Sequence, residues 1–302
     1  MPTMKVGFIG LGRMGLPMSY RLLAAGFDLT VHNRSQGKVR QISEAGAHPA
    51  ESAAQVVHDA DIVLACLPDV ATVRKVFLGE DGIVANARPG QVLVDHSTVG
   101  LDESKTCAAA AMEKGALFLD APISGGTERA GDGTLTIMAG GPPEAYQRAL
   151  PLFQAMGTTV RHMGPAGTGT VAKLVNQLLV GIHSVAAAEA MLLAAKSGAD
   201  PALVFEVVSS GWGQSFMLTR NAPVMLDRRF SDARAPVRTL LKDLGLLQDL
   251  TRELNTPTPA NDLAFRLFTE AAEAGLGDLD GPAVVLPMEE RAGCRIQRTS
   301  GR

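Results

Sequence analysis

The sequence contains few cysteines, and they are not clustered. Only three of its 302 residues are cysteine, at positions 66, 107 and 294, which is an odd number without the spacing of a zinc or iron–sulfur site. The six histidines include no HExxH pair and no Cys/His cluster. We therefore expect no metal, and a reducing, cytoplasmic setting.

An excess of one charge is also absent, as is a purely apolar segment. The formal net charge is −3 and the basic residues are dispersed, which excludes the footprint of nucleic-acid binding or of an anionic membrane partner and favours a small molecule. No cationic, apolar leader precedes the first predicted strand. The most apolar stretch, 174–195, contains Asn176, Gln177, His183 and Glu189, so it predicts a buried helix rather than a membrane span.

A glycine-rich turn follows the first predicted strand. Lys5–Ile9 leads into Gly10-Leu11-Gly12-Arg13-Met14-Gly15 and then into a helical pattern. The first glycine permits a tight turn, the second lets backbone N–H groups approach a pyrophosphate, and the third lets the helix pack against the strand. Glycine turns are common in α/β proteins, but this context predicts a dinucleotide site formed by Gly10, Leu11, Gly12, Arg13, Met14 and Gly15.

The end of the second predicted strand indicates which dinucleotide binds. A carboxylate there would accept hydrogen bonds from the ribose of NAD, but the chain has Asn33, Arg34, Ser35 and, one turn later, Lys38. Arginine, serine and lysine suit a 2′-phosphate, so we expect NADP, with NAD less favoured, and at least a tenfold preference for NADPH. Alternatively, Arg34 and Lys38 are a solvated surface pair and Ser35 is an ordinary helix N-cap.

The order of elements predicts an α/β fold with two domains. Apolar runs alternate with helical segments up to residue 164, which specifies a mostly parallel, doubly wound, Rossmann-like sheet. The predicted strands are 5–9, 29–32, 61–68, 91–94, 117–119, 135–139 and 159–161. Beyond residue 169 the pattern is all helical. We expect a dinucleotide-binding domain over 1–164, an all-α domain for substrate and oligomerisation over 165–290, and a flexible tail over 291–302.

A long predicted helix, 171–197, follows the last strand and would join the two domains, where substrate clefts often form. Lys173 and Asn176 are three residues apart and share a face that differs from the apolar stripe. A lysine can take and return the hydroxyl proton in alcohol oxidation, and an asparagine can orient the oxygen. The alternative for Lys173 is a surface lysine whose stem packs along the helix.

Six motifs follow one another over nearly the whole sequence. With these motifs the chain resembles the β-hydroxyacid dehydrogenase family, which includes 3-hydroxyisobutyrate dehydrogenases, tartronate semialdehyde reductases and glyoxylate/succinic semialdehyde reductases. The motifs are Gly10–Met18, Leu67-Pro68, Asp95–Thr98, Asp120–Gly126, Gly167–Asn176 and Lys242-Asp243-Leu244. The resemblance implies that Lys173 is the catalytic lysine. It also implies that Leu67, Pro68, Thr98 and Lys242 line the cofactor site, and that Ser124, Gly125, Gly126 and Asn176 hold the substrate.

Several of these residues have plainer interpretations. Ser124-Gly125-Gly126 could be a simple turn rather than a carboxylate-binding nest, and Lys242 could form an exposed helical pair with Asp243. Trp212, the only tryptophan, lies in a glycine-broken loop and either lines the substrate pocket or anchors the core. His96 is interpreted as a packed histidine rather than a base.

The chain departs from the family pattern at three positions, and these affect the identity of the substrate. Leu101 stands where the family commonly has proline, Gln177 replaces a second asparagine, and an aromatic residue is often found around Ala235.

The predicted function is an NADP-preferring oxidoreductase that interconverts a small 2- or 3-hydroxy acid, bearing a carboxylate, and its semialdehyde or keto form. The alternatives are an imine reductase of the same architecture, which usually lacks a lysine at position 173, and a non-catalytic NADP-binding module. A homodimer or homotetramer is expected.

Overall fold

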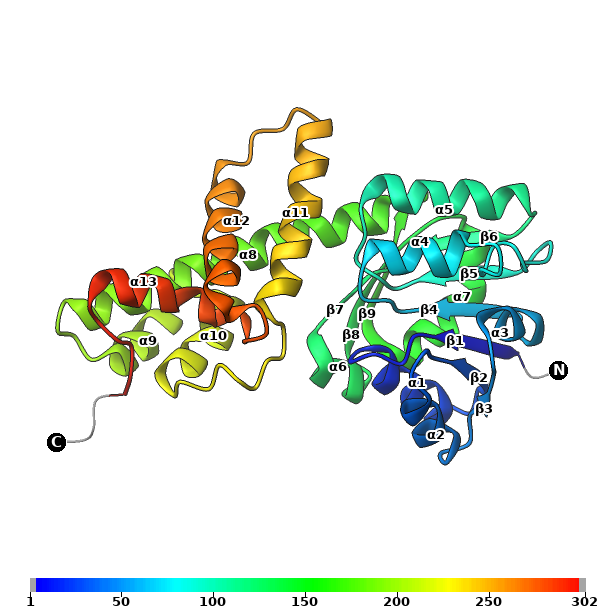
Figure 1. Ribbon diagram of the computed structural model, residues 1–302, viewed down its shortest axis with the longest axis horizontal. Helices are drawn as coiled ribbons and strands as arrows, with labels where there is room; N and C mark the ends of the chain where they lie inside the picture. Colours follow the sequence, from blue (N-terminus) through cyan, green and yellow to red (C-terminus); the bar gives the residue numbers. More distant parts are fainter. Residues whose placement is uncertain (1–3, 299–302) are drawn as a thin grey trace. The chain divides into compact units, whose positions relative to one another are not determined.

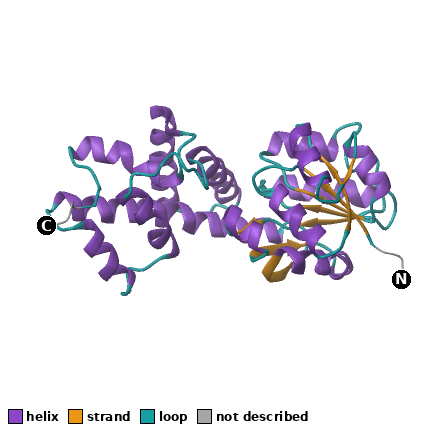
Figure 2. Ribbon diagram, turned by 90° about the horizontal axis from the view of Figure 1, so that it is seen from below, coloured by secondary structure: helices purple, strands orange, loops and turns teal. Residues whose placement is uncertain are grey.

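The computed structural model describes residues 4–298, which divide into two compact units at Lys173/Leu174. The first unit contains all the strands of this described range, and the second consists of helices and loops (Figures 1 and 2). This architecture confirms the predicted Rossmann-like domain followed by an all-α domain. The boundary between the compact units lies within helix α8 (Thr168–Lys196) rather than before it.

The sheet of the first unit has the strand order β3-β2-β1-β4-β5-β6-β8-β7, and β9 also pairs with β8. The strands from β3 to β6 are parallel, β8 pairs antiparallel with β6 and β7, and β8 and β9 are parallel. The strand bounds are β1 Lys5–Ile9, β2 Asp28–His32, β3 His48–Pro49, β4 Ile62–Ala65, β5 Val92–Asp95, β6 Leu117–Asp120, β7 Ile123–Ser124, β8 Leu135–Gly140 and β9 Gly157–Gly164. The central strands β4 and β5 are buried at every position, as expected for strands covered on both faces.

Helices connect most of the successive strands in the first unit. They are α1 Gly15–Ala24, α2 Gln36–Ser43, α3 Ala53–Asp59, α4 Val70–Leu78, α5 Leu101–Glu113, α6 Gly126–Asp132 and α7 Pro143–Met156. One buried cluster, which includes Phe8, Leu22 and Phe153, and a second, which includes Phe77 and Phe118, form the core of this unit. The carboxyl ends of the strands therefore rest on a closely packed scaffold.

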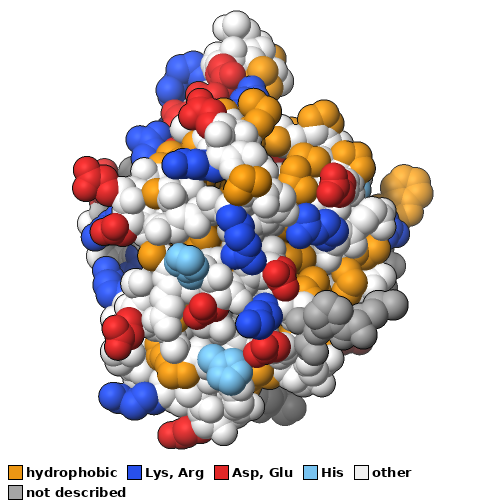
Figure 3. All heavy atoms as spheres, turned by 90° about the vertical axis from the view of Figure 1, so that its right-hand side faces the viewer, with side chains coloured by type: hydrophobic (Ala, Val, Ile, Leu, Met, Phe, Trp, Pro, Cys, Tyr) orange, Lys and Arg blue, Asp and Glu red, His pale blue; other side chains and the backbone are white. Residues whose placement is uncertain are grey.

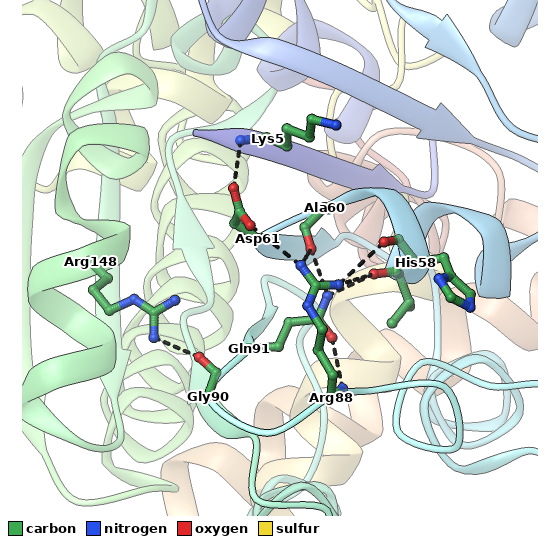
Figure 4. A network of polar contacts seen from close by, with 9 residues as sticks. Lys5, His58, Ala60, Asp61, Arg88, Gly90, Gln91 and Arg148 are labelled. Atoms are coloured by element: carbon green, nitrogen blue, oxygen red, sulfur yellow. Dashed lines mark hydrogen bonds and ion pairs between the residues drawn. The ribbon is translucent and has the colours of Figure 1, made fainter. Parts of the chain in front are cut away.

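A network of polar contacts fixes the loops at the opposite, amino-terminal end of the central strands (Figure 4). The guanidinium of Arg88 donates to the carbonyl oxygens of Val57, His58 and Ala60 at the end of α3, at 2.6 to 3.3 Å. Gln91 Nε2 donates to two of the same carbonyls. Because the last carbonyls of a helix have no partner within the helix, these side chains terminate α3 directly before β4.

The second unit is built from α9 (Pro201–Ser209), α10 (Phe216–Leu226), α11 (Val237–Glu253), α12 (Pro259–Ala271), the short η1 (Ala272–Leu276) and η2 (Gly281–Val284), α13 (Val285–Ala292) and the rest of α8. Its buried cluster includes Met191, Leu244 and Phe268. In the described range, α8 is the one helix long and apolar enough to cross a membrane by composition. It nevertheless buries Gln177 and Ser184, a pattern typical of a core helix.

The prediction of a flexible tail is wrong for residues 293–298. Ile296 is fully buried, its N–H donates to Glu289 Oε1 at 2.7 Å, and Arg298 Nε donates to Asp227 Oδ1 at 2.6 Å. The positively charged side chains in this segment hid the single apolar anchor, which has no periodic partner in the sequence. Residues 291–292 of the predicted tail belong to helix α13, and 299–302 lie outside the described residues.

Candidate active site

The predicted cofactor residues of the first unit, apart from Lys38 on α2, follow the carboxyl ends of the parallel strands. The loop after β1 is tied to the loop after β2, because Leu11 N–H donates to Asn33 Oδ1 at 3.0 Å and Gly10 N–H donates to the carbonyl of His32. Asn33 Nδ2 in turn donates to the carbonyl of Ser35 at 3.0 Å. Asn33 therefore fixes the shape of the glycine loop relative to the segment that carries Arg34 and Ser35.

The three glycines of this loop have different surroundings. A side chain at Gly15 would overlap the carbonyl oxygen of Gly10, whereas a Cβ at Gly12 would meet nothing within 4 Å. Gly12 and Arg13 are exposed, while Leu11 is buried and Met14 is half-buried. The open backbone at Gly12, three residues before α1 begins, leaves space for a pyrophosphate near a helix N-terminus, so the residues present fit a dinucleotide.

The residues predicted to recognise the 2′-phosphate are accessible. Arg34 and Ser35 are exposed, and Lys38 is half-buried on α2. Ser35 occupies the N-cap position of α2 but makes no side-chain capping hydrogen bond there. Ser35 therefore occupies the N-cap position that the alternative interpretation predicts, but its hydroxyl does not cap the helix.

The loops after β4, β5 and β6 are joined in the same way. Leu67 N–H donates to Ser97 Oγ at 2.9 Å, which holds the Leu67-Pro68 segment beside the segment that ends in Thr98. The His96 ring contacts the carbonyl oxygen of Ala121 at 2.6 Å, at the start of the segment leading to Ser124. These bonds hold together the loops at one edge of the sheet. The loops contain Leu67, Pro68, Thr98, Ser124, Gly125 and Gly126.

His96 and its neighbour Asp95 are both buried. Burial lowers the pKa of His96 to about 4, against the opposing hydrogen bond to Ala121, so the ring is neutral at pH 7 and packs edge-on against Phe153. This geometry agrees with the interpretation of His96 as a packed histidine. Burial also raises the pKa of the Cys66 and Cys107 thiols to about 12, which keeps them in the unreactive protonated form.

The start of α8 is tethered to this edge by Asp120, to which sequence reasoning assigned no role. Asp120 Oδ1 accepts from the Gly167 N–H and Oδ2 from the Thr170 N–H, both at 2.7 Å, and Thr170 Oγ1 contacts Ser104 Oγ at 2.7 Å. A carboxylate at the position where a strand ends could have signalled such a cap. The tether fixes the first turn of the helix that carries Lys173, whose side chain is 8 % exposed.

The remaining predicted residues belong to the second unit. Asn176 and Lys242 are half-buried, on α8 and α11 respectively, and Lys242 Nζ contacts Asp243 Oδ1 at 2.8 Å. The alternative of an exposed Lys242–Asp243 pair is wrong, because Asp243 is 3 % exposed. Trp212 is fully exposed in the turn between α9 and α10, so the alternative of a core anchor is also wrong.

Charge is not concentrated on the face of the molecule shown in Figure 3, where basic and acidic side chains are interspersed. Within residues 4–298 no group of three or more His, Cys, Asp or Glu side chains is placed to hold a metal.

Burial of Asp95 leads to a prediction about pH. Desolvation raises the pKa of Asp95 from 3.8 to about 6. Hydrogen bonds from Ser97 oppose this shift, and the negative charges of Asp120 and Glu103 add to it. The folded protein holds this proton between pH 3.8 and 6 while the unfolded chain does not, so the stabilising contribution is complete below 3.8 and is lost as the pH rises through 6. Asparagine at position 95 does not titrate, so Asp95→Asn should not lose this contribution as the pH rises. The free energy of unfolding of Asp95→Asn minus that of the wild type should therefore increase by about 2–3 kcal/mol between pH 4 and pH 7.5.

Urea unfolding of both proteins across this pH range measures the difference. Asp61→Asn, at an exposed carboxylate, is the matched control and should show a smaller change. A difference between Asp95→Asn and the wild type that is constant with pH would contradict the assignment.

The chain matches two family models in sequence. Residues 5–164 match the NAD-binding domain of 6-phosphogluconate dehydrogenase, and residues 167–288 match the NAD-binding domain of NADP-dependent 3-hydroxyisobutyrate dehydrogenase. The second model covers the helical unit from the first turn of α8 to α13.

Characterised relatives are similar along nearly their full length. The chain is 36 % identical to an NAD-dependent L-serine dehydrogenase of Pseudomonas aeruginosa, covering 91 % of this chain and 95 % of that protein. It is 35 % identical to the 2-hydroxy-3-oxopropionate reductase of Escherichia coli, covering 97 % and 100 %. These names describe oxidoreductases that act on a CH–OH group or its carbonyl form.

Solved structures agree with this result. The crystal structure of 3-hydroxyisobutyrate dehydrogenase from Salmonella typhimurium matches with a TM-score of 0.86 at 32 % identity, covering 94 % of this chain and 99 % of that one. An imine reductase from a Pseudomonas species matches with a TM-score of 0.62 at 23 % identity, which shows a shared fold alone. The chain is an oxidoreductase that acts on CH–OH groups and belongs to the β-hydroxyacid dehydrogenase family.

Proposed function

We propose that the protein is an NADP-preferring enzyme that interconverts a small 2- or 3-hydroxy acid and its semialdehyde or keto form, with Lys173 as the acid/base. The observation that carries this proposal is the placement of Lys173. It lies one turn into α8, its side chain is 8 % exposed, and Asp120 ties the first turn of the helix to the strand end. A buried lysine held in this way is suited to proton transfer rather than to a solvated surface.

The residues of the sheet edge divide the binding work. Gly10, Leu11, Gly12, Arg13, Met14 and Gly15 would hold the pyrophosphate, and Leu67, Pro68 and Thr98 the nicotinamide end. Lys242, which lies on α11 in the second unit, is also proposed to bind the nicotinamide end. When bound, NADP supplies the acceptor or donor of hydride. In the oxidative direction the neutral Lys173 Nζ accepts the proton of the substrate hydroxyl, and in reduction it returns that proton to the carbonyl oxygen.

The substrate is held by a second group of residues. Backbone N–H groups of Ser124, Gly125 and Gly126, at the end of β7, can bind a carboxylate. The backbone at Gly125 and Gly126 has φ of +137° and +71°, which glycine adopts readily. Asn176 would orient the reacting oxygen, and the exposed ring of Trp212 would cover a substrate or pack against a neighbouring subunit. A homodimer or homotetramer in the cytoplasm completes the proposal.

The experiment that tests the function is an activity panel with the purified protein. Its members are 3-hydroxyisobutyrate, L-serine, tartronate semialdehyde, succinic semialdehyde, glyoxylate and a cyclic imine, each with NADP(H) and NAD(H). We expect turnover of one of the hydroxy acids or aldehydes. Reduction of the imine in excess of the others would support an imine reductase, and NADPH binding without any turnover would support a non-catalytic module.

The preference for NADP should depend on Arg34. A charge-assisted hydrogen bond is worth about 1.5–3 kcal/mol, so the wild type should prefer NADPH to NADH at least tenfold in kcat/KM. Arg34→Ala should reduce that ratio about tenfold, mainly through KM for NADPH. Arg40→Ala, at an exposed arginine on the following helix α2, should leave the ratio unchanged. Equal efficiencies with both cofactors in the wild type would refute the preference.

A further inference from the structure

Four side chains of the second unit form a continuous polar chain from α8 to α11. Asn176 Nδ2 donates to Gln177 Oε1 at 2.9 Å, and Gln177 Nε2 donates to Asp243 Oδ2 at 2.6 Å. The other oxygen of Asp243 contacts Lys242 Nζ at 2.8 Å. Asn176 and Lys242, at the two ends, are residues of the proposed site, while Gln177 and Asp243 have no role in the proposed function.

The chemistry of the groups fixes the direction of every bond in this chain. An ionised carboxylate only accepts hydrogen bonds, so the Gln177 group facing Asp243 must be the amide nitrogen. The Gln177 oxygen must then face Asn176, and that oxygen also only accepts. Asn176 must therefore present its amide nitrogen to Gln177. Asp243, which contacts the Lys242 ammonium, thus determines the orientation of the Asn176 amide through the two hydrogen bonds of Gln177.

The chain is confined to a fixed geometry. Gln177 and Asp243 are 6 % and 3 % exposed, so water does not readily replace the bonds between them. A Cβ at Gly181, one turn after Gln177, would lie 2.6 Å from Leu244 Cδ2, which shows that α8 and α11 are closely packed beside the polar chain. The Gln177 side chain bridges Asn176 and Asp243, because its Oε1 accepts from Asn176 and its Nε2 donates to Asp243.

We propose that Gln177 is a positioning residue that sets the hydrogen-bond polarity of Asn176. With one Nδ2–H bound to Gln177, the Asn176 amide offers its second N–H to the reacting oxygen of the substrate. The proposal rests on the proposed function, because it acts through Asn176. It also gives a physical role to the glutamine that stands where the resemblance leads us to expect a second asparagine.

Two substitutions at position 177 separate polarity from packing. Gln177→Met keeps the length of the side chain and removes both bonds, so kcat/KM should fall about 10- to 100-fold while the Kd for NADPH stays within twofold. In Gln177→Glu two carboxyl groups meet, and they share one proton only when the pH is low enough. The protonated form can donate to Asp243 and accept from Asn176, so activity relative to the wild type should rise at least tenfold between pH 9 and pH 6.

The controls use Gln248, another glutamine of the same unit. Gln248→Met and Gln248→Glu, on α11, change a half-buried side chain outside the polar chain and should leave kcat/KM and its pH profile unchanged. All assays use the panel substrate with the highest kcat/KM and NADP(H). Thermal unfolding of each variant verifies that the protein is folded at the assay temperature.

A double substitution tests whether Gln177 acts through Asn176. Adding Gln177→Met to Asn176→Ala should cost less than twofold, because the amide to be oriented is already absent. The proposal is overturned if the two effects multiply, if Gln177→Met keeps kcat/KM within twofold, or if the activity ratio of Gln177→Glu is independent of pH. Where Gln177→Met fails to fold, the pH profile of Gln177→Glu decides alone. Full activity of Asn176→Ala would instead refute the proposed function itself.

Discussion

Replacing Lys173 with alanine should lower kcat about 10²- to 10⁴-fold, the usual contribution of a general acid–base group. The Kd for NADPH should change less than twofold, because Lys173 is proposed to act on the hydroxyl proton rather than on the cofactor. Stopped-flow or steady-state turnover together with fluorescence titration of NADPH separates the two quantities. A variant that keeps its turnover would disprove the proposed proton transfer.

The size of the expected effect depends on where the lysine lies. Its side chain is 8 % exposed, so alanine also removes buried aliphatic surface. Lys173→Met keeps most of that stem and should lose as much turnover as Lys173→Ala. If the loss in Lys173→Ala came from packing, Lys173→Met would regain the turnover. Lys105→Ala, at an exposed lysine on α5, is the control and should keep full activity.

Long periodic segments were predictable from the sequence because a repeated burial pattern determines them. The helix predicted over 171–197 reproduces α8 (Thr168–Lys196) to within three residues at either end. The two-residue strands β3 and β7 were missed, since two residues show no periodicity and their pairing depends on neighbouring strands. Likewise α3 ends through contacts with Arg88, which lies about thirty residues later in the sequence.

The candidate site was predictable to the extent that its residues follow strand ends. The glycine loop and the segment before Thr98 are local motifs whose position on a parallel sheet is set by the strand order. The supporting residues were not predictable in the same way: Asp120 acts on Gly167 and Thr170, and Gln177 on Asp243. Each of these bonds spans more than 40 residues, so it depends on the register between elements that the sequence pattern leaves open.

Trp212 shows a limit of reasoning from residue type. A lone tryptophan is usually well buried, but this one is fully exposed between α9 and α10. Its loop is bracketed by Gly211 and Gly213, both of them exposed, and no apolar periodicity directs the ring toward the core.

The glycine loop carries the second large prediction, in which two glycines three residues apart have opposite effects. A methyl group at Gly15 would overlap the Gly10 carbonyl oxygen and lie 2.9 Å from Phe8 Cε1. Gly15→Ala must therefore push α1 away from β1, and its free energy of unfolding without cofactor should fall by about 1–3 kcal/mol or more. Because a Cβ at Gly12 meets no protein atom within 4 Å, Gly12→Ala should change that free energy by less than about 0.5 kcal/mol.

The affinity for NADPH should respond differently from stability. At Gly12 the added methyl group would occupy the space that the pyrophosphate requires, so the Kd for NADPH should rise at least tenfold in a protein that is as stable as the wild type. Gly37→Ala, at an open and exposed position in α2, should leave the Kd for NADPH unchanged and should raise the free energy of unfolding by at most about 1 kcal/mol. Urea unfolding of the cofactor-free variants and NADPH titration measure the two effects independently. If Gly12→Ala bound NADPH as tightly as the wild type, the pyrophosphate would have to lie elsewhere, because no other constraint on this position requires a glycine.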